Sequence, residues 1–116
     1  MPIMTATPLS GSSGGRPVPI IATSSPGTTI HTLSTATGIV EEVYVDAYNI
    51  SASGATLQLE AGSTATIGIM SIFVPALSFQ RILAGARYLA ATGAISAYAT
   101  ATSLFQVVGG VNKVTP

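Results

Sequence analysis

Few residues in this sequence could carry acid–base or ligand chemistry. It contains one histidine, His31, and no cysteine, so a serine–histidine pair would need this imidazole and a cysteine–histidine pair is impossible. His31 lies in the threonine-rich stretch TTIHTL. We expect this stretch to be a strand that turns His31 towards solvent or an interface, with Ile30 and Thr32 facing the opposite way.

The acidic residues do not form a convincing catalytic pair either. They are Glu41, Glu42, Asp46 and Glu60. Glu41 and Glu42 are adjacent, and adjacent strand residues point to opposite faces, so these two cannot easily share a substrate. One histidine and four acids also make no convincing transition-metal set. We therefore expect no enzyme, and predict no catalytic residue, no metal site and no cofactor.

The stretch from Ile39 to Gly62, IVEEVYVDAYNISASGATLQLEAG, predicts two strands joined by a turn over 51–54. Both arms alternate, and we expect them to pair as an antiparallel hairpin with one face in the core. The residues expected on the apolar face are Val43, Val45, Ala47, Leu57 and Leu59. Those expected on the outer face, which would carry almost all the negative charge, include Glu42, Tyr44, Asp46, Tyr48, Gln58 and Glu60.

Short β-rich segments separated by turn signals fill the rest of the chain. Residues 77–83 also allow a helix, because Phe79, Ile82 and Leu83 have helical spacing, but their alternation and the early Gly85 favour a strand. The other predicted strands cover residues 17–23, 28–33, 63–74, 87–91, 94–100, 103–108 and 111–114. About eight short strands predict an all-β fold, an antiparallel β-sandwich or a jelly-roll-like barrel.

The first 16 residues differ from the rest because they show no periodicity and are rich in glycine and serine. We expect a flexible N-terminal arm over residues 1–16 and a β-sandwich domain over 17–116. The arm could order against a neighbouring molecule, or it could be an idle disordered terminus. The residues predicted to make such contacts are Met1, Ile3, Met4, Leu9 and Arg16.

The segment 63–74 is apolar on both faces, which suggests a strand covered by the core on one side and by another subunit on the other. The residues predicted at this subunit interface are Ile67, Met70, Ile72, Phe73, Arg81 and Arg87. The two arginines could pair with the acids of the central stretch, within a subunit or across an interface.

Composition favours association over isolation. Charged residues make up only 7% of the chain and the formal net charge is zero, whereas mixed surface charge usually keeps domains apart. The sequence lacks a basic patch for nucleic acid and a segment of about 20 apolar residues for a membrane span. Its start does not have the pattern of a secretory signal peptide. We expect neither nucleic acid nor a membrane as a partner.

Three stretches carry a resemblance that covers most of residues 15–115: GRPVPIIATSSPGTTIHTL, EEVYVDAYNISASGATLQLEAG and the closing GGVNKV. Together they resemble small β-rich virion proteins of tailed bacteriophages, most of all head decoration (cement) proteins. The resemblance implies a compact β-fold without catalytic residues. It also implies a homotrimer, made in the bacterial cytoplasm, that binds the major capsid protein on the capsid exterior and bridges its subunits.

Two other functions remain open. The chain could be a tail, neck or fibre-associated virion protein, because the resemblance does not distinguish head from tail. It could instead be a small carbohydrate-binding β-sandwich that uses the stripe of Tyr44, Asp46 and Tyr48. Catalysis at His31 is the least favoured hypothesis.

Overall fold

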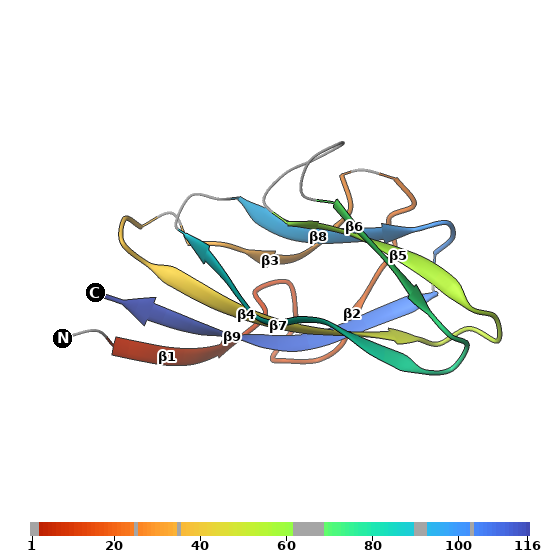
Figure 1. The fold of residues 1–116 in the computed structure, drawn as a ribbon, viewed down its shortest axis with the longest axis horizontal. Coiled ribbons are helices and arrows are strands. Elements are labelled where there is room, and N and C mark those ends of the chain that lie inside the picture. The colour runs from red at the N-terminus through yellow and green to blue at the C-terminus, as the bar shows by residue number, and fades with distance from the viewer. Residues whose placement is uncertain (1–2, 25, 35, 62–68, 90–92, 103) are drawn as a thin grey trace.

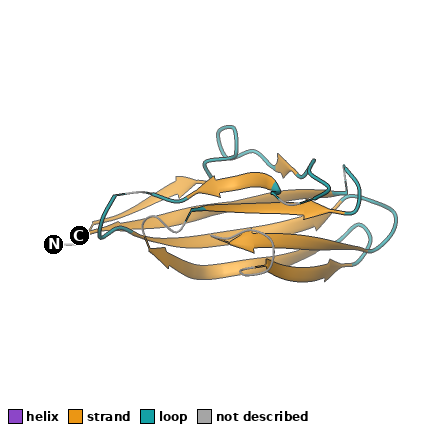
Figure 2. Ribbon diagram, turned by 90° about the horizontal axis from the view of Figure 1, so that it is seen from above, coloured by secondary structure: helices purple, strands orange, loops and turns teal. Residues whose placement is uncertain are grey.

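The computed structural model describes residues 3–24, 26–34, 36–61, 69–89, 93–102 and 104–116. Within these ranges all regular structure is β-strand (Figures 1 and 2). The same ranges contain no helix long and apolar enough to cross a membrane. The nine strands are β1 (Ile3–Pro8), β2 (Val18–Pro19), β3 (Thr28–Thr32), β4 (Val40–Asn49), β5 (Ala55–Ala61), β6 (Ile69–Val74), β7 (Phe79–Leu89), β8 (Ala94–Ala99) and β9 (Phe105–Thr115).

The strands pair like one long hairpin that has been rolled up. Apart from the short β2, they form nested antiparallel pairs: β1 with β9, β3 with β8, β4 with β7 and β5 with β6. Rolling this hairpin brings β9 against β4 and β8 against β5. The result is two stacked sheets, in the orders β1-β9-β4-β7 and β3-β8-β5-β6, with β2 beside β9. This is the strand order of a jelly roll, so the predicted all-β sandwich is confirmed.

The core lies between the two sheets and consists mainly of aliphatic side chains. In β4 the alternation works as predicted, because Val43, Val45 and Ala47 are completely buried. Leu57 and Leu59 face them from β5 in the other sheet. Each fully buried valine or leucine contributes roughly 1.5–3 kcal/mol relative to an exposed side chain.

The predicted hairpin between the two arms of the central stretch is wrong. β4 and β5 lie in different sheets, since both edges of β4 are occupied by β7 and β9. The segment between them crosses from one sheet to the other. The prediction of the charged face is also wrong for Glu60, which is buried. Alternation identifies the faces of a strand but not its neighbours, and this explains the error.

Several predicted strands are longer or shorter in the structure. Residues 77–83 and 87–91 were expected as two strands, whereas β7 runs without interruption from Phe79 to Leu89 and absorbs two irregularities in its pairing with β4. The segments 103–108 and 111–114 likewise merge into β9, which continues through Gly109 and Gly110. Of the expected strand at 17–23, only Val18–Pro19 is a strand.

The N-terminal segment is docked on its own chain. Residues 3–8 form β1 along β9, and Leu9 is buried in the core. The prediction of a featureless arm is therefore corrected for these residues, because hydrogen bonding to an exposed strand edge needs no hydrophobic periodicity. A reach from this segment to a neighbouring subunit remains a prediction.

Candidate interaction surface

The outer face of the β1-β9-β4-β7 sheet carries two ion pairs. On β7, Arg81 donates to Asp46 at 2.9 Å and Arg87 donates to Glu42 at 2.9 Å. The hydrogen bond to Asp46 and the negative charge of Asp46 raise the pKa of Arg81 above its ordinary value. These pairs lie within one chain, as one of the two sequence-based alternatives expected. Such exposed pairs contribute little to stability, but they neutralise this face.

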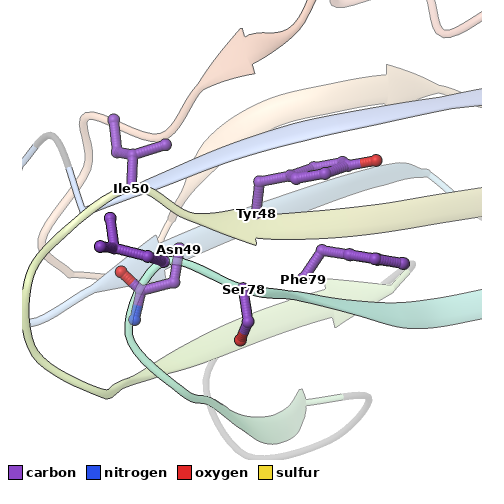
Figure 3. Close-up of a pocket in the computed structure, with 6 residues that line it drawn as sticks. Tyr48, Asn49, Ile50, Ser78 and Phe79 are labelled. Atoms are coloured by element: carbon purple, nitrogen blue, oxygen red, sulfur yellow. The ribbon is translucent and has the colours of Figure 1, made fainter.

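The same face ends in a group of exposed apolar side chains, which we call the apolar end: Tyr48, Ile50, Leu77 and Phe79. The rings of Tyr48 on β4 and Phe79 on β7 stack with centroids 5.2 Å apart (Figure 3). With Ile50, Leu77 and two polar neighbours they line a hollow of about 330 Å³. An adjoining hollow is lined by Pro17 and Val108 together with Tyr48 and Ile50. The apolar end lies where β4 leads to β5 and β6 to β7, opposite the termini (Figure 1).

Leu77 is the most exposed large apolar residue among those the structure describes, at 74%. Its φ of 52° lies in the left-handed region, which costs a residue with a Cβ about 1–2 kcal/mol. Its backbone N–H donates to the carbonyl of Ser51 at 3.2 Å, and this contact holds the turn in place. The backbone is thus strained at a residue whose aliphatic side chain lies in solvent.

Asn49 supports the apolar end from inside. It is 2% exposed, and its amide nitrogen donates to the carbonyls of Ser53 and Val74, each at 2.9 Å. Its amide oxygen accepts from the N–H and the hydroxyl of Ser51. Because Asn49 ends β4 and Val74 ends β6, the side chain ties the two sheets together at this end. The asparagine of the glycosylation-type triplet Asn49-Ile50-Ser51 is therefore engaged in the interior.

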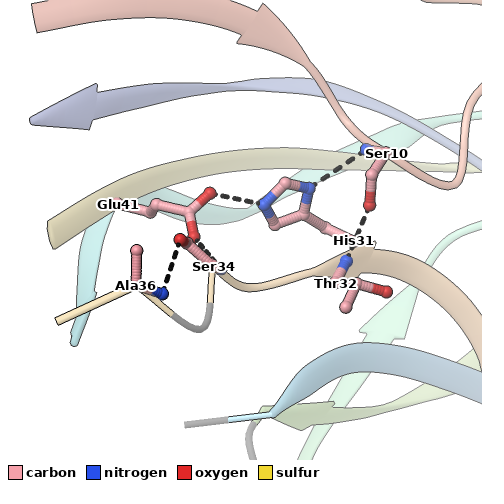
Figure 4. A network of polar contacts seen from close by, with 6 residues as sticks. All are labelled: Ser10, His31, Thr32, Ser34, Ala36 and Glu41. Carbon is pink, nitrogen blue, oxygen red and sulfur yellow. Dashed lines mark hydrogen bonds and ion pairs between the residues drawn. The ribbon is translucent and has the colours of Figure 1, made fainter. Parts of the chain in front are cut away.

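His31 and Glu41 form a second buried group (Figure 4). The Nε2 atom of His31 lies 2.8 Å from a Glu41 oxygen, and Nδ1 accepts the Ser10 N–H at 3.0 Å. Because Nδ1 accepts a hydrogen bond, Nε2 carries the proton and donates to the carboxylate. The second oxygen of Glu41 accepts the N–H of Ser34. Both ring nitrogens are thus committed to structural contacts.

The prediction that His31 faces solvent or an interface is wrong, since this residue is buried. Its pairing with β8 shifts register between Thr29 and His31, so that Ile30 and His31 both point inward. A β-bulge of this kind breaks the simple alternation on which the prediction relied.

Glu60 is buried among polar partners rather than presented as a ligand. Its carboxylate accepts the Gly27 N–H at 2.9 Å and the Ser96 hydroxyl at 3.3 Å. Within the described ranges, no three His, Cys, Asp or Glu side chains are grouped so as to hold a metal ion.

The predicted contact residues are dispersed over the molecule. Met1 and Ile67 lie outside the described residues. On β1, Ile3 and Met4 are exposed, whereas Leu9 is buried. Of the predicted interface on β6, Met70 and Phe73 are exposed and Ile72 packs partly against the core. Arg16, Arg81 and Arg87 are exposed.

The structure therefore does not bring the predicted residues together in one place, because β1 and β6 belong to different sheets. The sequence reasoning missed the apolar end. The pairing of Tyr48 with Phe79 depends on the contact between β4 and β7, which no local pattern reveals.

Comparison with known protein families and with curated proteins finds no match for this sequence.

Proposed function

We propose that this chain is a structural protein of a tailed-phage virion. It binds the outside of the capsid and stabilises the shell by bridging neighbouring major capsid protein subunits. The observation that carries this proposal is the apolar end, where four large apolar side chains are held in solvent on a well-packed sandwich. Contiguous exposed apolar side chains usually mark a binding surface.

The strain at Leu77 strengthens the argument. At a φ of 52°, glycine or asparagine would fold with less backbone strain than Leu77. A leucine that costs backbone energy and remains 74% exposed gains little from its own fold. Contact with another protein would bury it and offset that cost.

The neutral outer face fits the same role. Arg81 and Arg87 are compensated by Asp46 and Glu42, so the sheet beside the apolar end presents no strong field of one sign. Such a surface can approach a shell through many weak contacts repeated by symmetry. The jelly roll is used by viral capsid proteins and also by lectins, so the fold by itself supports more than one function.

The variant Leu77→Asn tests the binding surface. Asparagine tolerates the left-handed conformation, so we expect stability unchanged or higher by up to about 1 kcal/mol. At the same time the protein should rebind less well to particles that lack it, measured as copies per particle. The matched control is Ile21→Asn, which removes a similarly exposed aliphatic side chain outside the apolar end. Equal occupancy for both variants would contradict a role for the apolar end.

Immunogold labelling of intact particles tests the location. Dense label over the heads is the expected result. Label confined to the tail or neck would replace the capsid with a tail-associated role, and no label on particles accessible to the antibody would overturn the virion function.

A second candidate is carbohydrate binding by the stripe of Tyr44, Asp46 and Tyr48. The observation in its favour is that all three lie on the outer face of β4, where the Tyr48 ring is partly exposed. Against it, Asp46 is already paired with Arg81. A glycan screen with the wild type and Tyr44→Ala tests it: binding lost in the variant supports the candidate, and a screen without binding excludes it.

A further inference from the structure

The two edges of the β1-β9-β4-β7 sheet are protected very differently. β7 has two irregularities in its ladder and exposes Arg81 and Arg87, which are devices that discourage pairing with another strand. β1 pairs with β9 in continuous register over all six residues. All six side chains are exposed and none is charged. Among the described strands, β9 is the only partner of β1, so its other edge is open.

This open edge is held in place rather than left loose. Immediately after β1, Ser10 donates its N–H to His31 and accepts the Thr32 N–H at 2.7 Å on its hydroxyl. Gly11 donates to the carbonyl of Ile30 at 2.8 Å. The buried pair of His31 and Glu41 thereby fastens the strand to the sandwich (Figure 4). A fixed edge loses little conformational freedom when another strand binds.

The sequence of β1 is complementary to itself. In the stretch PIMTATP, residues 2 and 8 are both proline and stand at equal distances from Thr5. If two copies pair antiparallel about a two-fold axis at Thr5, Met4 lies opposite Ala6 and Ile3 lies opposite Thr7. Pairs of apolar and β-branched residues suit neighbouring strands. Proline at each end limits the ladder because it donates no N–H.

We propose that β1 is a self-association edge, where two copies of this chain pair antiparallel across Thr5 and join their sheets into one continuous sheet. The symmetric spacing of the prolines favours a second copy over a strand from another protein. A two-fold contact of this kind closes on itself, so it links two copies or two larger rings and cannot by itself build a trimer. The proposal does not depend on the virion function.

Cysteine cross-linking tests the pairing and its register, because the chain contains no cysteine of its own. Opposite residues of antiparallel strands have Cα atoms about 4.5–5.5 Å apart, within the range that a disulfide can bridge. We expect Thr5→Cys to give a covalent dimer under mild oxidation. Ile3→Cys and Thr7→Cys should each give little covalent dimer alone and should form a covalent dimer when they are mixed. Thr37→Cys, at another exposed threonine, is the control for random collision.

A second measurement avoids the disulfide. In light scattering, Thr5→Lys should halve the mass of the native assembly, while its circular dichroism and melting temperature stay at the wild-type values. Cross-linking of Thr5→Cys no faster than that of Thr37→Cys would overturn the proposal. So would a wild-type protein that is monomeric at its highest soluble concentration, or one whose mass is unchanged in Thr5→Lys. Because these experiments use purified protein without capsids, their outcome is separate from the test of the proposed function.

Discussion

At the scale of single residues, the buried polar groups of this protein connect segments that are distant in the sequence. His31 is the clearest case, because each ring nitrogen connects it to a different segment: Nε2 to Glu41 on β4 and Nδ1 to the backbone of Ser10. Among the described residues, every buried side-chain nitrogen or oxygen has a hydrogen-bond partner. A network satisfied to this degree stabilises one arrangement, and it becomes costly when one member is removed.

His31→Leu should therefore destabilise the protein strongly. The substitution leaves the Glu41 carboxylate buried without its ring partner and the Ser10 N–H without an acceptor. Removing one member of a buried pair typically costs about 3–5 kcal/mol. Urea unfolding measures the loss, and hydrogen exchange should show the amides of β1 exchanging faster than those of β5. The double variant His31→Leu/Glu41→Leu should recover part of the loss, and a single variant as stable as the wild type would contradict this role.

At the scale of strands, β9 organises one sheet, since it pairs with β1, β2 and β4. The sequence predicted a break at Gly109-Gly110, but the strand continues through both. The reason for the first glycine is steric. A Cβ on Gly109 would lie only 1.9 Å from the carbonyl oxygen of Tyr44, whereas one on Gly110 would meet nothing closer than the Thr7 oxygen at 3.3 Å.

Two adjacent substitutions separate these roles. Gly109→Ala should force β9 away from β4 and cost at least about 3 kcal/mol, at the upper end of overpacking effects or beyond. Gly110→Ala should cost less than about 1 kcal/mol, because a shift of a few tenths of an ångström accommodates it. Chemical denaturation of the two variants provides the comparison. Similar stabilities would show that the close approach of the two strands is not rigid.

The same strands show what the sequence could predict. Alternation in β4 identified Val43, Val45 and Ala47 as core residues, because burial of one sheet face leaves a local pattern. It could not identify β7 and β9 as the neighbours of β4, since pairing between distant segments leaves no such pattern. The His31 bulge and the apolar end were missed for the same reason. Both depend on which strands are neighbours. The close approach of β9 to β4 requires a glycine at Gly109, but a glycine in the sequence does not show which strand approaches it.

At the scale of the whole molecule, the rolled hairpin separates the two proposed contact regions. The termini and β1 lie at one end of a body 48 Å long, and the apolar end lies at the other (Figure 1). A protein with this arrangement can bind a copy of itself and another partner without competition between the two. The arrangement requires that the two sheets remain packed against each other along the whole length of the sandwich.

Asn49 holds the two sheets together at the apolar end. It is the last residue of β4, and its side chain donates to the carbonyl of Val74, the last residue of β6. Asn49→Asp keeps the shape of the side chain but replaces a donor with an acceptor that faces the carbonyls of Ser53 and Val74. We expect a loss of about 2–4 kcal/mol, the cost of unsatisfied and opposed polar groups in a buried site. Asn112→Asp, at a half-buried position of β9, is the matched control.

If Asn49 couples the sheets, fluorescence and circular dichroism should report one shared unfolding transition in the wild type and two separate transitions in Asn49→Asp. A single transition at wild-type stability in that variant would show that the core alone holds the sheets together.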